Sequence, residues 1–145
     1  MKLTSSAFDH NQKIPVVYTC DGQKINPPLA ISGVPKEAKS LALIVEDPDA
    51  PTGTFVHWIV WNIDPETLEI PEGSVPEKSQ EGLNGAGKEG YVGPCPPTGQ
   101  HRYFFTLYAL DTTLGLNGQA KREDLDAAMQ GHITAQATLV GVYRR

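Results

Sequence analysis

Residues 39–63 read KSLALIVEDPDAPTGTFVHWIVWNI, and this stretch decides the fold. It contains two short apolar runs, Lys39–Glu46 and Thr54–Ile63, which are rich in β-branched and aromatic residues and too short for typical helices. Between them, Asp47–Gly53 is a string of Asp, Pro and Gly that favours a turn. The stretch therefore predicts two β-strands separated by a turn.

Further runs of the same kind follow along the chain. His101–Leu110 and Ala137–Tyr143 predict two more strands, and Leu3–Phe8 and Val16–Cys20 are weaker strand candidates. Two of the four main runs are apolar on both alternating faces, which is typical of strands in the middle of a packed sheet.

Only Arg122–Gln130 predicts a helix, because acidic residues occupy its first turn and Gly131 follows its end. Gly and Pro together make up 26 of the 145 residues and are spread among the apolar runs, as in a loop-rich β protein. We therefore expect residues 1–145 to form a single, mostly antiparallel β domain with a few short helices.

The net charge, the length of the apolar runs and the cysteines exclude some classes of partner and indicate a cellular compartment. The net charge of −5 argues against a nucleic-acid partner, which needs a basic face. No apolar run approaches the length of a membrane span, so we expect no stable membrane insertion. Met1–Ser6 shows no secretory leader, so we expect a cytoplasmic protein in which Cys20 and Cys95 are reduced thiols.

One motif resembles a phosphate-binding loop. Gly82–Lys88 matches G-x-x-x-x-G-K, but Glu89 stands where a magnesium-binding Ser or Thr belongs. The flanking residues predict neither the strand before such a loop nor the helix after it. We therefore reject a nucleotide-hydrolysis site and expect a flexible, glycine-rich loop.

Polar side chains gather at the ends of the predicted strands. Asp47 and Asp49 follow the first buried run, and His57 lies early in the next. Strict alternation places His57 on the same face as three apolar residues: Phe55, Ile59 and Trp61. A histidine on such a face is either a hydrogen-bonded core residue or a ligand-binding or acid–base group, and the pattern leaves both open.

A second group precedes the strand at His101–Leu110. Gly99 leads into His101, and Tyr103 shares its face with His101. Backbone N–H groups of such a loop can form an anion-binding nest, although an ordinary loop-to-strand junction has the same pattern. The two histidine-bearing strands can converge on one site that also holds Asp47 and Asp49.

Three chemistries could use that site. Metal binding is not expected, because no paired-histidine or Cys–His spacing is present. Nucleophilic catalysis is not expected either, because there is no G-x-S-x-G motif and Cys95 lies between two prolines. Recognition of an anion or zwitterion fits best. Imidazoles, a phenol and loop N–H groups would receive a phosphate, while the carboxylates orient the histidines or meet a cationic group.

Two long motifs carry a family resemblance. DPDAP at residues 47–51 with His57-Trp58, and GPCPPTGQHRY at residues 93–103, resemble the signatures of the phosphatidylethanolamine-binding protein family, also called Raf kinase inhibitor-like. The segments Tyr18–Gly22 and Gly131–Tyr143 resemble its short bacterial and archaeal branch. The resemblance covers nearly the whole chain.

The resemblance implies a β-sandwich of one large and one smaller sheet, with a small cavity for phosphate-bearing anions such as the phosphoethanolamine head group. Carried over residue by residue, it implies these ligand-binding residues: Asp47, Asp49, His57, Pro94, Pro96, Gly99, His101 and Tyr103. We expect no metal and no cofactor.

We therefore expect a soluble, non-enzymatic binding domain for small anionic or phosphorylated ligands, nucleotides among them. The alternative is a protein-interaction module that inhibits a peptidase, through an exposed loop such as Pro76–Lys88, or a kinase pathway. A weak hydrolase ranks third. The residues leave the natural ligand and a homodimer open.

Overall fold

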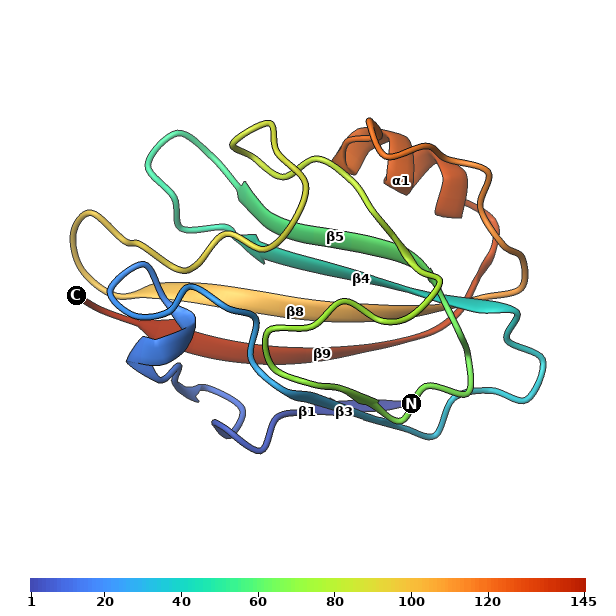
Figure 1. Ribbon diagram of the computed structural model, residues 1–145, viewed down its shortest axis with the longest axis horizontal. Coiled ribbons are helices and arrows are strands. Elements are labelled where there is room, and N and C mark those ends of the chain that lie inside the picture. The colour runs from blue at the N-terminus through green and yellow to red at the C-terminus, as the bar shows by residue number, and fades with distance from the viewer.

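The computed structural model describes residues 1–145 and consists of a large and a small sheet packed face to face (Figure 1). The large sheet has six strands in the order β2-β9-β8-β4-β5-β7. Their bounds are Gln12–Lys13 (β2), Ser40–Asp47 (β4), Phe55–Ile63 (β5), Gln80–Glu81 (β7), His101–Leu110 (β8) and Ile133–Tyr143 (β9). The small sheet has the order β1-β3-β6, formed by Lys2–Thr4, Leu29–Ser32 and Glu69–Ile70. The predicted sandwich of unequal sheets is confirmed.

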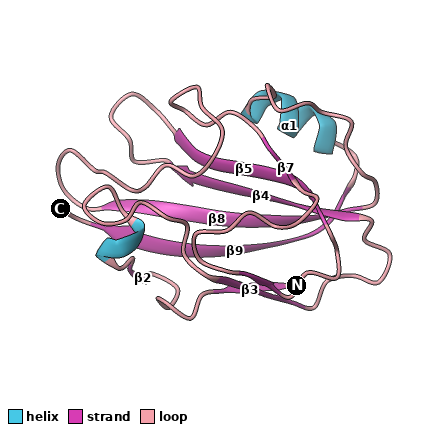
Figure 2. Cartoon of the chain, in the orientation of Figure 1, coloured by secondary structure: helices cyan, strands magenta, loops and turns pink.

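The large sheet is mixed rather than purely antiparallel. β2 lies beside the C-terminal end of β9 (Figure 2). It runs parallel to β9, while every other neighbouring pair of strands is antiparallel. Backbone hydrogen bonds from Asn11 N to Val140 O and from Ile14 N to Val142 O hold this N-terminal segment beside β9. A parallel pair needs a long connection, which the chain between β2 and β9 supplies.

Two apolar cores lie on opposite faces of the large sheet. The core between the sheets takes Leu41, Leu43 and Val45 from β4, and the core beneath the helix takes Ala42 and Ile44 from the same strand. None of the five is more than 1% exposed. β4 is thus buried on both faces, as its uninterrupted apolar run predicts.

The four main predicted strands are present as β4, β5, β8 and β9. β8 has the predicted bounds, whereas β9 begins at Ile133 instead of Ala137. The weaker candidate at Leu3–Phe8 shortens to β1, because Ser5 Oγ accepts a hydrogen bond from Ala7 N and turns the chain.

The predicted strand at Val16–Cys20 is wrong. Val16–Tyr18 instead form a 3₁₀ turn, η1. The backbone N and the hydroxyl of Thr19 both donate to Val16 O, at 3.0 and 2.8 Å, and close this turn. A Thr that bonds its own neighbouring backbone competes with sheet pairing, which overrides the β preference of the two valines.

The predicted helix forms as α1, Arg122–Met129, one residue shorter than expected. Lys121 N donates to Asp124 Oδ2 at its start, and Gly131 follows its end with a φ of +82°. Leu125 and Met129 pack on the outer face of the large sheet. With eight residues, this single α-helix is too short to cross a bilayer.

Candidate functional site

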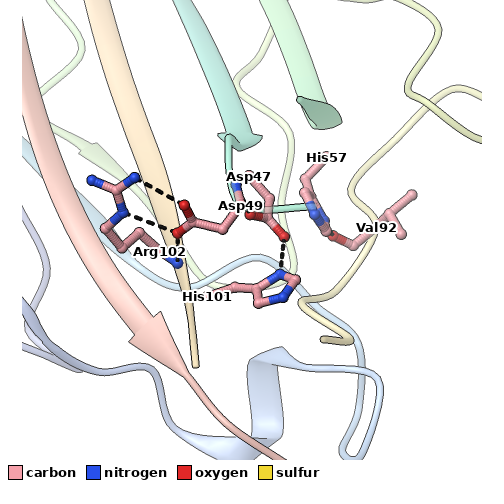
Figure 3. A network of polar contacts seen from close by, with 6 residues as sticks. All are labelled: Asp47, Asp49, His57, Val92, His101 and Arg102. Carbon is pink, nitrogen blue, oxygen red and sulfur yellow. Dashed lines mark hydrogen bonds and ion pairs between the residues drawn. The ribbon is translucent and has the colours of Figure 1, made fainter. Parts of the chain in front are cut away.

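The candidate site lies where β4 ends and β5 and β8 begin, at one end of the large sheet (Figure 3). The three strands are antiparallel neighbours, so Asp47 at the end of β4 comes beside His57 and His101 near the starts of its two neighbours. Sequence positions far apart thus supply one cluster. It consists of Asp47, His57, His101 and Tyr103, here called the histidine cluster.

Asp47 and His101 form a buried pair. The Nδ1 atom of His101 lies 2.7 Å from Oδ2 of Asp47, and the residues are 6% and 4% exposed. The other carboxylate oxygen, Oδ1, accepts a hydrogen bond of 2.8 Å from Asp49 N. Because an ionised carboxylate only accepts, Nδ1 of His101 carries the proton and Nε2 is left without a partner in the chain.

His57 lies at a β-bulge. β4 pairs Val45 with Trp58 and Glu46 with Val56, which leaves His57 as the extra residue of β5. A bulge interrupts strict alternation. His57 therefore leaves the face of Ile59 and Trp61, where alternation had placed it.

The bulge turns His57 toward the histidine cluster. Its ring packs edge-on against Phe55 and Tyr103, with centroid distances of 4.9 and 5.3 Å. Nδ1 donates to the carbonyl of Val92 at 2.6 Å, which leaves Nε2 without a partner in the chain. Burial lowers the pKa of His57, so its ring is neutral near pH 7.

Tyr103 lies between the two imidazoles. Its ring stacks with that of His101 at a centroid distance of 6.5 Å, and the residue is 0% exposed. Its hydroxyl has no hydrogen-bond partner, although the Asp47 carboxylate is near enough to raise its pKa further above the ordinary value, after burial as the main cause. A buried hydroxyl without a partner costs free energy, and in native proteins it commonly marks a ligand or water position.

Asp49 points away from the histidine cluster, toward Arg102 (Figure 3). Its carboxylate accepts three hydrogen bonds of 2.9 Å, from the backbone N, Nε and Nη2 of Arg102. These bonds lower the pKa of Asp49 to about 2. Asp49 thus fastens the start of β8 to the turn after β4, and its charge is matched by a guanidinium.

The proline-rich segment before β8 supplies the remaining predicted residues. Pro94 and Pro96 are buried, and Gly99 is exposed with a φ of +70°, which favours glycine. Pro94 O accepts a hydrogen bond of 3.1 Å from Cys20 N. A side chain at Gly93 would come within 2.8 Å of the Thr19 backbone, so glycine lets the two segments meet.

Cys20 and Cys95 join these segments by a disulfide, so the expectation of reduced thiols is wrong. The cysteines are 75 residues apart, and only the folded sandwich brings their Cα atoms to 5.4 Å. Disulfides persist in oxidising compartments and in the cytosol of hyperthermophiles. The cytoplasmic location therefore stays a prediction.

Sequence reasoning missed two groups that orient the site. Arg102 had a signal, because it lies inside the motif that carries His101. The Val92 carbonyl had no such signal in the sequence, because every residue has a backbone carbonyl and residue identity does not show which of them binds a side chain.

The five principal surface hollows are lined by residues other than His57, His101 and Tyr103. No group of three His, Cys, Asp or Glu side chains is arranged to hold a metal ion.

The arrangement suits hydrogen bonding to an oxyanion. It offers one phenolic donor and two imidazole edges, and both neighbouring carboxylates are already engaged. Each imidazole Nε2 accepts a hydrogen bond from a protonated ligand oxygen when the ring is neutral and donates one when the ring is charged.

Comparisons with known proteins cover the whole chain. The family model described as "Phosphatidylethanolamine-binding protein" matches residues 4–144. A UPF0098 protein of Methanothermobacter thermautotrophicus is 51% identical over 150 residues, covering 100% of this chain and 99% of the relative. A crystal structure from Chlamydia trachomatis, described as a homologue of the phosphatidylethanolamine-binding proteins, has a TM-score of 0.96 and 48% identity, covering 99% of this chain and 97% of that chain. YbcL of Escherichia coli has a TM-score of 0.93 and 28% identity, with 99% and 98% covered.

Proposed function

Because the chain belongs to the phosphatidylethanolamine-binding protein family, we propose that it is a non-enzymatic binding domain for small phosphate-bearing or similar anions. The observation that carries this proposal is the unpartnered hydroxyl of Tyr103, buried between two imidazoles with free Nε2 atoms. An anionic oxygen would accept from that hydroxyl, and, where the rings are neutral, protonated oxygens of the same ligand would donate to Nε2 of His57 and of His101.

The charges around the histidine cluster support a ligand of mixed charge. Two carboxylates beside a phosphate would repel it, but Asp49 is paired with Arg102 and Asp47 with His101. The Asp49–Arg102 pair is neutral, whereas the Asp47 carboxylate keeps its negative charge wherever the ring of His101 is neutral. A ligand that also carries an ammonium group, such as phosphoethanolamine, would turn that charge into an attraction. Nucleotides carry the same phosphate chemistry and belong among the ligands tested.

The test is an NMR titration of the four histidines with phosphate, phosphoethanolamine and ethanolamine. We expect saturable shifts of the His57 and His101 ring signals with the two phosphates and smaller ones with ethanolamine. His10 and His132 lie outside the cluster and serve as internal controls. Equal, non-saturating shifts of all four rings, or no shift of the clustered pair, would refute the proposal.

The hairpin between Leu83 and Glu89, which is ordered by side-chain hydrogen bonds, supports a second function, the inhibition of a peptidase. Leu83 pairs with Glu89, and the side chain of Asn84 accepts from Ala86 N and Lys88 N while donating to Gly90 O. These bonds hold the exposed loop that the sequence predicted to be flexible. An inhibitor would lose activity in Lys88→Ala and keep it in His101→Ala, whereas an anion-binding protein shows the reverse pattern in the titration.

A further inference from the structure

The outer ring nitrogen of His57, Nε2, is a hydrogen-bond acceptor that the chain leaves free. Nδ1 lies 2.6 Å from the carbonyl oxygen of Val92. Because a carbonyl only accepts, Nδ1 carries the proton, and Nε2 of the neutral ring keeps its lone pair. The buried polar side-chain atoms without a partner are Tyr103 Oη and Trp61 Nε1, so Nε2 of His57, which is not among them, reaches the surface. A ligand can therefore meet it there.

The surroundings of His57 keep its ring neutral. Burial lowers the pKa of His57 and outweighs two groups that raise it, the Val92 carbonyl and the Asp47 carboxylate on β4. From β8, a charged His101 would lower this pKa further, and the uncharged phenol of Tyr103 packs edge-on against the ring. The carbonyl that holds Nδ1 is itself neutral. Near pH 7 and above, Nε2 therefore accepts a hydrogen bond and does not donate one.

This acceptor constrains the ligand oxygen that binds beside it. An oxygen without a proton brings only lone pairs, and two acceptors that face each other repel. A proton must therefore lie between Nε2 of His57 and the ligand. It comes either from the ligand, as an O–H group, or from solvent, which means charging a buried ring at a cost in free energy. A ligand that carries its own proton avoids this cost.

We propose that the histidine cluster selects oxyanions that carry an ionisable proton, and that His57 makes this selection; the inference rests on the anion-binding function proposed above. Hydrogenphosphate donates its O–H to Nε2 of His57, while another of its oxygens accepts from the Tyr103 hydroxyl. Sulfate and phosphodiesters have no proton to donate at neutral pH. A phosphate monoester qualifies while it keeps its last proton, which it loses with a pKa of about 6.

Hydrogenphosphate and sulfate form a matched pair of probes, because both are tetrahedral dianions and they differ by one proton. NMR titrations at about pH 8, where phosphate is mainly this dianion, compare them at equal charge. The ring signals of His57 and His101 report binding. We expect a Kd for phosphate about tenfold lower than that for sulfate, the ratio that corresponds to one hydrogen bond.

His57→Ala tests which residue makes the selection. It removes the acceptor, so phosphate should bind about tenfold more weakly, sulfate should bind no more weakly, and the two Kd values should converge. Tyr103→Phe is the matched control. Its lost donor serves both anions, so both should weaken by about the same factor and the selectivity should remain. The ring signals of His101 report binding in both variants.

The pH dependence gives a second readout in the unaltered protein. Between about pH 8 and about pH 6, sulfate should bind more tightly as the pH falls, by up to about tenfold per unit, since protonation of His57 supplies the missing donor. Phosphate brings its own proton and should gain less, so the selectivity should shrink. Equal Kd values for the two anions at about pH 8, or a selectivity that His57→Ala leaves intact, would overturn this inference while the anion site stands. Saturation by neither anion would refute the proposed function, and the inference with it.

Discussion

Asp47 uses both carboxylate oxygens inside the protein, one for Nδ1 of His101 at 2.7 Å and one for the backbone N of Asp49 at 2.8 Å. A second histidine–aspartate pair, His132 with Asp111, has the same Nδ1–Oδ1 distance of 2.7 Å. Its side chains are exposed, to 45% for His132 and 49% for Asp111. The two pairs share their geometry and differ in burial.

Asp47→Asn should lower the free energy of unfolding by about 1–3 kcal/mol, because the amide accepts at only one atom and leaves a buried donor unpaired. Asp111→Asn is the matched control and should cost less than about 1 kcal/mol, since water replaces the exposed partner. Urea denaturation of both variants measures the difference. Equal costs would contradict the importance of burial at Asp47.

Tyr103→Phe should stabilise the free protein and weaken ligand binding. Removing a buried hydroxyl without a partner should raise the free energy of unfolding by about 1 kcal/mol. The same change should reduce affinity for phosphate by about tenfold, because the proposed donor is lost. Tyr143→Phe, whose hydroxyl donates to Asp21 at 2.7 Å, should lower stability instead. A destabilised Tyr103→Phe would mean that the hydroxyl already has a partner in solution.

Stability should fall as the pH drops below about 6.5 because of His57. Burial lowers the pKa of the folded ring, so below the ordinary histidine pKa the unfolded chain takes up a proton that the folded chain does not. The loss continues down to the lowered pKa of the folded ring. Asp49, with a pKa of about 2, adds a similar loss only at much lower pH.

His57→Gln checks this dependence, because it keeps a donor for the Val92 carbonyl and cannot titrate. Unfolding free energies measured between pH about 5 and 7 should fall less steeply in the variant than in the wild type. Parallel curves would show that His57 titrates normally in the folded protein.

The disulfide should contribute about 4 kcal/mol in the chain-entropy account, given the 75 residues between its cysteines. Replacing both Cys20 and Cys95 by Ser should lower the midpoint of guanidinium denaturation accordingly. Adding a reductant should affect the wild type and leave the double variant unchanged. A wild type insensitive to reductant would mean that the cysteines are reduced in solution.

The four long strands of the large sheet (β4, β5, β8 and β9) could be predicted because their apolar runs are bounded by turn residues. β9 was predicted short, since Thr134 and Gln136 on its exposed face hide the apolar pattern of its first half. β2, β6 and β7 have two residues each, and such strands are defined only by the partner that they meet in the fold. The turn at Val16–Tyr18 was missed because the hydroxyl of Thr19 outweighs local β preference.

The sequence predicted which residues belong to the candidate site, but not the directions of their side chains or the contacts between them. Alternation failed at His57, because a bulge depends on how β4 and β5 align and leaves no mark in residue spacing. The direction of Asp49 depends on Arg102, a residue 53 positions away. The disulfide likewise needs the folded sandwich to bring its cysteines together.

The bond between Cys20 and Cys95 also encloses β3 to β7 in one covalent loop. A peptidase that cut the exposed hairpin between Leu83 and Glu89 would produce a nicked chain whose two fragments stay joined. On a denaturing gel the fragments would separate only after reduction. The protein can therefore lose the continuity of its backbone at this exposed loop without losing either piece.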